Sequence, residues 1–274
     1  AKGDTIAKVI IYDVDEKKVN CFKSEVSYLS DYSDDEMHEF SKLGGEITND
    51  ISDCSDCNAY IIAVPTPLDK SRSPDLHYLE AALSDIREVI NPGDLISIES
   101  TTYPGTTRFL LNKIFAQQII NFGSDLHICY SPEREDPGKR NRSNYSITNI
   151  PKIISGLNET SLNLGVELYG NCIEKLVPVE SLEMAELTKC LENTYRAVNI
   201  GLVNELKIYA DKLNLDLNKA IDAAATKPFG FTPFRPGPGL GGHCIPVDPF
   251  YLSWHAKTLG VDLSFIEQAG KINS

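Results

Sequence analysis

Short apolar runs alternate with helical patterns through the first two thirds of the chain. Residues 60–64 are apolar without interruption, which is typical of a strand that is covered on both faces of a sheet, and residues 95–98 predict the next strand. Between them, residues 76–90 carry apolar side chains at helical spacing, and Asn91-Pro92-Gly93 ends that pattern. This alternation predicts a Rossmann-like doubly wound α/β domain with a parallel sheet over residues 1–178.

The same patterns place the other elements of this domain. Further strands are predicted at 9–12, 46–48, 126–130, 153–154 and 175–177, and helices at 16–22, 34–43, 159–169 and from 105 to near 118.

The pattern changes at Ser181, which is a suitable N-cap. Apolar side chains then recur every three or four positions and predict one helix of about thirty residues. They are Leu187, Leu191, Tyr195, Val198, Leu202, Leu206, Tyr209 and Leu213. With helices at 214–225 and from 248 onward, residues 179–274 are expected to form an all-helical central domain. We expect this domain to form a homodimer through the long helix 181–213.

A second stripe on the long helix combines polar and small residues. Its members are Lys189, Asn193, Ala197, Gly201 and Asn204. Small residues allow another segment to approach closely, and Lys189 and Asn193 share a face from which both can reach one ligand. A solvated polar face is the alternative reading of the same stripe.

Composition narrows the class of protein. The chain has 274 residues, enough for about two domains, with 42% hydrophobic and 24% charged residues, as in soluble globular proteins. A net charge of −13 argues against nucleic-acid binding. No apolar run reaches the ~20 residues of a membrane span, and no signal peptide opens the chain. Seven cysteines without a framework spacing indicate a reducing cytoplasm, and the single Cys54-x-x-Cys57 pair is too small for a metal site.

A loop between Phe229 and Tyr251 holds the candidate nucleophile. Five glycines and five prolines lie between Gly230 and Pro249, and Cys244 stands among them after His243. Bare backbone lets a ligand approach, and a thiolate is a strong nucleophile, although a structural cysteine is the alternative. The segment 237–242 imitates a dinucleotide fingerprint, but no strand precedes it and Pro238 interrupts it, so we reject that reading.

Three polar pairs follow predicted strands: Pro65-Thr66, Thr101-Thr102 and Glu133-Arg134. Ligands of doubly wound sheets bind outside the carboxyl ends of the strands, although each pair alone could simply form a turn. Asp13 stands at the end of the first predicted strand. In Rossmann domains, the acidic residue that binds the adenosine ribose also stands at the end of a strand. That residue normally lies about 20 positions after a glycine-rich turn. Only twelve residues precede Asp13, with one glycine among them, so we expect the first Rossmann strand and its turn to be absent.

These stretches together resemble the UDP-glucose/GDP-mannose dehydrogenase family, most closely its branch that oxidises UDP-N-acetylhexosamines. The resemblance covers nearly the whole chain. It rests on YDVDEKKV, VPTP, ESTTYPGTT, YSPERED, ELTKCLENTYRAVNIGLVNEL and, most specifically, ATKPFGFTPFRPGPGLGGHCIPVDPFYLSW.

The resemblance implies a reaction and roles for residues. A UDP-sugar, first of all UDP-N-acetylglucosamine, would be oxidised twice by NAD at C6 to the uronic acid, through a thiohemiacetal and a thioester on Cys244. Lys189 and Asn193 would stabilise oxyanions, Glu133 would be the general base, and Thr102 and Asp248 would hold water and protons.

The resemblance also implies two sets of binding residues. The NAD contacts would be Asp13, Lys18, Val64, Pro65, Thr66 and Thr102. The substrate contacts would be Glu133, Arg134, Lys189, Asn193, Arg235, Gly239, Gly241 and Gly242. The pathway implied is the synthesis of capsule or lipopolysaccharide precursors.

Two departures from the family pattern matter. Val247 replaces a lysine of UDP-glucose dehydrogenases, which favours N-acetylhexosamines without choosing among their epimers. The C-terminal domain that covers the uridine nucleotide is expected to be absent, so this chain alone is expected to bind NAD poorly and to turn over little. The alternatives are of three kinds. The substrate could be UDP-glucose or UDP-N-acetylmannosamine, the chain could be a dehydrogenase of the 6-phosphogluconate type, or it could be a non-catalytic dimer scaffold.

Overall fold

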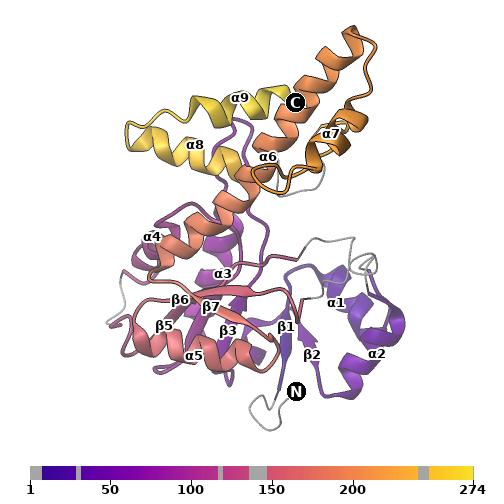
Figure 1. Ribbon diagram of the computed structural model, residues 1–274. Coiled ribbons are helices and arrows are strands. Elements are labelled where there is room, and N and C mark those ends of the chain that lie inside the picture. Colours follow the sequence, from indigo (N-terminus) through magenta and orange to yellow (C-terminus); the bar gives the residue numbers. More distant parts are fainter. Residues whose placement is uncertain (1–7, 29–31, 117–119, 136–146, 240–246, 274) are drawn as a thin grey trace. The chain divides into compact units, whose positions relative to one another are not determined.

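The computed structural model describes residues 8–28, 32–116, 120–135, 147–239 and 247–273. The chain forms two compact units. The first consists of residues 1–64, 77–100 and 107–185, and the second of residues 65–76, 101–106 and 186–274. Figure 1 shows the elements of each unit.

The described strands of the first unit form two sheets. Parallel strands β1 (Ile10–Tyr12) and β2 (Glu46–Thr48) make the smaller one. The larger sheet has the order β3 (Ala59–Ile62), β4 (Leu95–Ile98), β5 (His127–Tyr130), β6 (Lys152–Gly156) and β7 (Leu176–Pro178). The predicted Rossmann-like α/β fold is thereby confirmed.

Two strands run opposite to the direction that a fully parallel sheet would give. β3, β4 and β5 are parallel, but β6 runs antiparallel to β5, and β7 follows the direction of β6. Adjacent parallel strands are usually joined through a crossover helix. The described part of the connection from β5 to β6 contains no helix, whereas α5 (Glu159–Gly170) joins β6 to β7.

The two sheets of the first unit can be compared with the common Rossmann strand order. In the common Rossmann order 3-2-1-4-5-6, strand 1 lies between strands 2 and 4. Asp13 directly follows β1, which corresponds to strand 2, and β3 corresponds to strand 4. Among the described residues, no strand lies between β1 and β3 and no ladder joins them.

Helices pack on the strands close to their predicted positions. They are α1 (Glu16–Lys23), α2 (Asp34–Lys42), α3 (His77–Arg87), α4 (Thr106–Ile114) and α5. Ile96, Ile98, Ile128 and Ile154 of the sheet have no exposed surface. The apolar run 60–64 predicts a strand covered on both faces, but Ile61 of β3 is 50% exposed, so that expectation is wrong for one face of β3. Cys54 ends the short 3-10 helix η1 (Ile51–Cys54), and the described residues contain no cluster suited to a metal ion.

The second unit is built on the long helix α6 (Leu182–Lys212), which has 31 residues. Its predicted cap is confirmed, since the hydroxyl of Ser181 accepts a hydrogen bond from the Met184 amide at 3.1 Å. α7 (Leu217–Ala225), α8 (Asp248–Thr258) and α9 (Ser264–Ile272) follow. α7 begins later than residue 214, because the Asp216 side chain caps it. None of the described helices is long and apolar enough to cross a membrane.

The two stripes of α6 have opposite surroundings. Most of the apolar stripe is exposed, including Leu191 (59%), Leu202 (53%) and Tyr209 (64%). The polar and small stripe is packed: a Cβ at Gly201 would lie 2.9 Å from the Asn273 amide, and Asn204 bonds to Asn273 at 2.7 Å. The close approach predicted from the small residues is therefore made by α9.

Candidate active site

Glu133 occupies the carboxyl end of β5 in the first unit. One carboxylate oxygen accepts the backbone N–H groups of Arg134 and Glu135, both at 2.6 Å, and the other accepts the Lys152 ammonium at 3.2 Å. Burial alone would raise the pKa of Glu133, but the charge of Lys152 and these hydrogen bonds outweigh it and lower that pKa. Glu133 is therefore held as a carboxylate, the form that a general base requires.

Arg134 is committed to the fold. Its guanidinium donates a hydrogen bond to the carbonyl of Pro151, the residue before β6. Glu133 and Arg134 are neighbours at one sheet edge, as their sequence position predicts, and the Glu133 carboxylate is paired with Lys152.

Asp13 and Lys18 form a second polar cluster of the first unit. The Lys18 ammonium lies 2.8 Å from one Asp13 oxygen, and the other oxygen accepts the Asp15 amide at 2.9 Å. The Asp13 amide bonds to the Thr48 carbonyl at 3.1 Å, which ties the end of β1 to β2. Asp13 keeps acceptor capacity, so its carboxylate suits the ribose hydroxyls of NAD.

Val64 also belongs to the first unit. Its carbonyl accepts the Ser100 hydroxyl at 2.7 Å, which joins the chain after β3 to the chain after β4.

In the second unit, three predicted residues come together in a buried cluster. Lys189 and Asn193 on α6 are 8% and 2% exposed, and Asp248, the first residue of α8, is 2% exposed. The Asn193 amide donates to the Asp248 carboxylate, and Arg196 donates to the Asn193 oxygen at 3.2 Å. Burial raises the pKa of Asp248 to about 6, while the Asn193 hydrogen bond and the charges of Lys189 and Arg196 oppose that rise.

Thr102 is bound to the same helix. Its hydroxyl donates to Glu186 at 3.1 Å, and its carbonyl accepts the Cys190 thiol at 3.3 Å. Glu186 is fully buried and also accepts the Gly105 amide at 2.6 Å. Sequence reasoning missed Glu186, although it lies three residues before Lys189 and seven before Asn193, on the same helical face.

The loop with Pro65 and Thr66 is anchored by a tyrosine of α8. The Tyr251 hydroxyl donates to the carbonyls of Thr66, at 2.8 Å, and Pro67, at 3.1 Å. Tyr251 has no exposed surface, and its ring meets the Tyr103 ring edge to face at 6.4 Å. The predicted cofactor loop is thus anchored by hydrogen bonds from a buried tyrosine hydroxyl.

The remaining predicted residues belong to the glycine-rich loop. Arg235 bonds to the Asn218 carbonyl at 3.2 Å and forms an ion pair with Asp222 on α7. Gly239 has a positive φ of 79°, a conformation that favours glycine. Gly241, Gly242, His243 and Cys244 lie outside the described residues.

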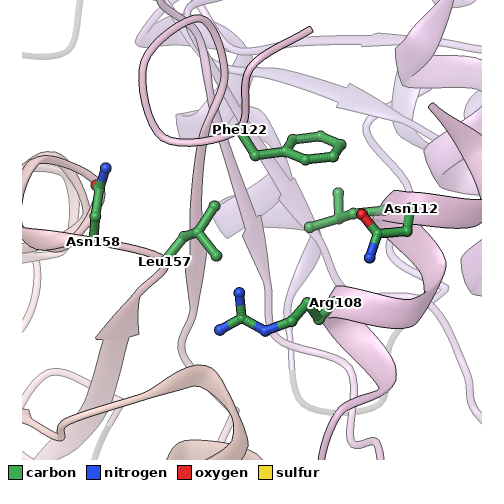
Figure 2. A pocket seen from close by; sticks show the side chains of 6 residues that line it. Arg108, Asn112, Phe122, Leu157 and Asn158 are labelled. Atoms are coloured by element: carbon green, nitrogen blue, oxygen red, sulfur yellow. The ribbon is translucent and has the colours of Figure 1, made fainter. Parts of the chain in front are cut away.

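A pocket of about 380 Å³ in the first unit contains none of the predicted residues. Figure 2 shows its lining, with Phe122 and Leu157 facing Arg108 and Asn112 of α4. Arg108 pairs with Glu183 at 2.7 Å, and Asn158 caps α5 through Ser161 at 2.9 Å. Arg108 and Asn158 therefore already have structural partners, and none of the predicted site residues lines the pocket.

Family models match both parts of the chain. Residues 3–173 match the NAD binding domain of the UDP-glucose/GDP-mannose dehydrogenase family, and residues 183–274 match the central domain of the same family.

Individual relatives agree with these matches. UDP-N-acetyl-D-glucosamine 6-dehydrogenase from Salmonella typhi is 37% identical over 97% of this chain and 61% of its own length. UDP-N-acetyl-D-mannosamine dehydrogenase from Pyrococcus horikoshii is 33% identical over 97% of this chain and 62% of its own length. A solved structure of UDP-D-ManNAc dehydrogenase from Pyrococcus horikoshii superposes with a TM-score of 0.88 at 32% identity, with coverage of 97% and 62%.

The chain thus spans about three fifths of the length of these relatives. Over that span, both of the matched domains occur in the order that the sequence motifs indicate. The chain belongs to the UDP-glucose/GDP-mannose dehydrogenase family.

Proposed function

We propose that this chain carries the NAD-binding and central parts of a dehydrogenase that oxidises the C6 hydroxyl of UDP-N-acetylglucosamine to the carboxylate. The observation that carries the proposal is the buried cluster of Lys189, Asn193 and Asp248. A cation, an amide and a carboxylate kept from water suit the stabilisation of oxyanions and the storage of a proton. The relative from Salmonella typhi, named for this substrate, supports the choice of sugar.

NAD supplies the hydride acceptor for each of the two oxidations. On the protein side, the Asp13 carboxylate would accept the ribose hydroxyls, with Lys18 holding the carboxylate in place. Val64, Pro65, Thr66 and Thr102 would be further contacts of the cofactor.

The first oxidation converts the C6 alcohol to an aldehyde, with the hydroxyl proton passing to a base, for which we propose Glu133. The Cys244 thiolate then adds to the aldehyde carbon, and the resulting oxyanion takes up a proton as a thiohemiacetal. Lys189 and Asn193 would stabilise the oxyanion.

The second oxidation removes hydride from the thiohemiacetal carbon and a proton from its hydroxyl, which leaves a thioester on Cys244. Water then adds to the thioester, the C–S bond breaks, and the acid and the free thiol are released. Thr102 and Asp248 would hold the water and its proton. A pKa of about 6 suits Asp248 to exchange protons near neutral pH.

The diphosphate of the substrate would be bound by Arg235 and by the backbone N–H groups of Gly239, Gly241 and Gly242. Arg134 would contact the substrate beside Glu133. Arg235 now pairs with Asp222 on the surface, so binding of a diphosphate would exchange one anionic partner for another.

We also propose that residues 1–178 act as the NAD-binding domain and residues 179–274 as the central domain, and that the latter forms a homodimer. The exposed apolar stripe of α6 supports the dimer, because such a stripe on a helix surface normally packs against another chain or domain. An enzyme of this kind would work in the cytoplasm, where NAD and nucleotide sugars are found.

A second candidate is oxidation of UDP-N-acetylmannosamine, favoured by the relative and the solved structure from Pyrococcus horikoshii. UDP-glucose oxidation and a non-catalytic scaffold are further alternatives. The experiment is a panel of these nucleotide sugars with NAD and the full-length protein, measuring NADH formed per sugar consumed. Two NADH per UDP-N-acetylglucosamine are expected; two with another sugar would change the substrate and keep the chemistry.

A matched variant tests the mechanism in the same assay. Cys244→Ser should abolish acid formation, whereas Cys172→Ser, at an exposed free cysteine, should leave it unchanged. One NADH per sugar, or acid formation by the Cys244→Ser variant, would contradict the thioester route. A folded protein that forms no NADH with any sugar would favour the scaffold.

A further inference from the structure

Lys152 is a buried cation at the start of β6 in the first unit. Its ammonium lies 3.2 Å from Glu133 and 3.3 Å from Glu99, and its side chain is only 6% exposed. Burying a lysine is costly unless anions compensate for the lost hydration. The first residue of a strand does not need a charge for folding. The presence of a buried lysine at this position therefore indicates a role beyond folding.

The lysine also contacts an aromatic ring. Its ammonium lies 5.2 Å from the ring centre of Tyr169 on α5, which is within the range of a cation–π contact. The Tyr169 hydroxyl shares a hydrogen bond of 2.7 Å with Ser97 and also contacts the Glu99 carboxylate. The ammonium is therefore held between two strands and a helix, with little freedom to leave Glu133.

We propose that Lys152 is a positioning residue for the base of the reaction: shared between Glu99 and Glu133, its ammonium keeps the Glu133 carboxylate ionised and in one orientation. This inference rests on the proposed function of Glu133. The orientation is completed by two backbone N–H groups, those of Arg134 and Glu135, which bind the Glu133 oxygen that Lys152 leaves free. The Arg134 guanidinium donates a hydrogen bond to the Pro151 carbonyl, and the Lys152 ammonium lies 3.2 Å from the Glu133 carboxylate.

The arrangement predicts opposite effects for the two partners of Glu133. One ammonium serves two carboxylates, so loss of its charge raises the pKa of Glu133. Conversely, neutralising Glu99 removes a neighbouring negative charge and leaves the ammonium to Glu133 alone, which lowers that pKa. If Lys152 and Glu99 had purely structural roles, their substitutions would not shift the pKa of Glu133 in opposite directions.

The experiment follows the carboxyl carbons of ¹³C-labelled glutamate by NMR against pH in this chain, with Glu133→Gln identifying the Glu133 signal. Lys152→Met should move the Glu133 midpoint up by about 1 pH unit, and Glu99→Gln should move it down. Methionine is chosen because a cavity of about 10 Å³ adjoins the pair, and a shorter side chain would enlarge it.

Two further variants keep the test decisive. The double variant Glu99→Gln/Lys152→Met keeps the net local charge of −1 and leaves no buried carboxylate without its cation except Glu133. It is therefore the variant to use if Lys152→Met alone fails to fold. Its Glu133 midpoint should lie above that of Glu99→Gln. Lys113→Met, which removes a surface lysine paired with Glu80 at 2.7 Å, should leave the midpoint unchanged. Equal midpoints in folded wild-type, Lys152→Met and Glu99→Gln proteins would overturn the inference.

Activity of the full-length protein separates this inference from the proposed function. If Glu133 is the base, the acid limb of kcat/KM should shift in the same direction as the NMR midpoint in each variant. NMR shifts without a shift of the acid limb would support the link between Lys152 and Glu133 and contradict the role of Glu133 as base.

Discussion

The side-chain amide of Asn193 donates a hydrogen bond to the carboxylate of Asp248, 55 positions along the chain, and each of the two residues is 2% exposed. One amide donor replaces only part of the hydration that this carboxylate loses on folding. Burial therefore raises the pKa of Asp248 to about 6. The pKa of Asp248, the acid of the cluster with Lys189 and Asn193, thus lies close to neutral pH.

This relationship predicts a pH-dependent effect of Asp248→Asn. Since the pKa of Asp248 is raised from 3.8 to about 6, the folded state binds the proton more tightly than the unfolded state. The stability that Asp248 contributes is fully present below pH 3.8 and is lost as the pH rises through about 6. Asparagine does not titrate, so the variant should gain stability relative to the wild type across this window, by up to about 3 kcal/mol.

Urea denaturation at several pH values between 4 and 8 measures this difference. The exposed Asp56→Asn variant provides the control and should follow the wild type. If the wild-type and Asp248→Asn curves stay parallel over the whole range, Asp248 does not titrate as its surroundings imply.

Asp13→Asn should weaken NAD binding. The substitution keeps the shape of the side chain but removes the charge that makes a hydrogen bond to a ribose hydroxyl strong, which is worth a factor of about ten or more in affinity. Calorimetric titration of the full-length protein with NAD measures it, without any need for turnover. Asp35→Asn on α2 is the matched control, and equal affinity of all three proteins would exclude Asp13 as a contact.

Substitution by alanine should affect stability differently at Gly156, the last residue of β6, and at Gly170, the last residue of α5. A Cβ at Gly156 would lie 2.3 Å from the Leu162 amide nitrogen and 2.7 Å from the Asn158 carbonyl, and neither backbone atom can move away easily. Gly156→Ala should therefore destabilise the first unit by about 3 kcal/mol or more. Gly170, at the end of α5, has nothing within 4 Å of such a Cβ.

Gly170→Ala is accordingly the control and should be neutral or stabilise the protein by up to about 1 kcal/mol. Thermal unfolding followed by circular dichroism compares the two variants. A melting temperature for Gly156→Ala equal to that of the wild type would show that α5 can move away from β6 at little cost.

Charges placed in the exposed apolar stripe of α6 should prevent dimer formation. Leu202→Glu with Tyr209→Glu would bring like charges together in a homodimer built on this stripe, and buried unpaired charges are strongly unfavourable. Sedimentation velocity should show a monomer. Lys219→Glu on the exposed surface of α7 changes charge outside the stripe and should leave the dimer intact.

An unchanged dimer in the double variant would locate the contact elsewhere on the chain. A monomeric wild-type protein at all concentrations would contradict the dimer itself.

Much of the local structure could be read from the sequence because helices and strands have short periods. The spacing of Leu187 to Leu213 predicts a long helix, and the helix α6 has that extent within a few residues. Strands are predicted at 95–98 and 126–130, and the structure has β4 and β5 there. Lys189, Asn193 and Asp248 were also predicted as site residues, because they lie in long specific motifs, and the structure brings them into one cluster.

Other features could not be obtained from local patterns, because they depend on contacts between residues far apart. Strand periodicity is the same in both directions, so it could not show that β6 runs antiparallel to β5. Glu186 and Lys152 look like ordinary charged residues on a helix and at a strand end. Only folding places Glu186 against Thr102, 84 positions away, and Lys152 between Glu99 and Glu133.

The sequence by itself therefore determined the order of elements, the family and most of the reactive residue types, since these depend on short periods and contiguous motifs. The tertiary structure alone decided which charges are buried together and which stripe of α6 faces a neighbour. The physical reason is that burial and pairing change the energy of a charge by several kcal/mol, and both depend on residues that sequence distance does not reveal.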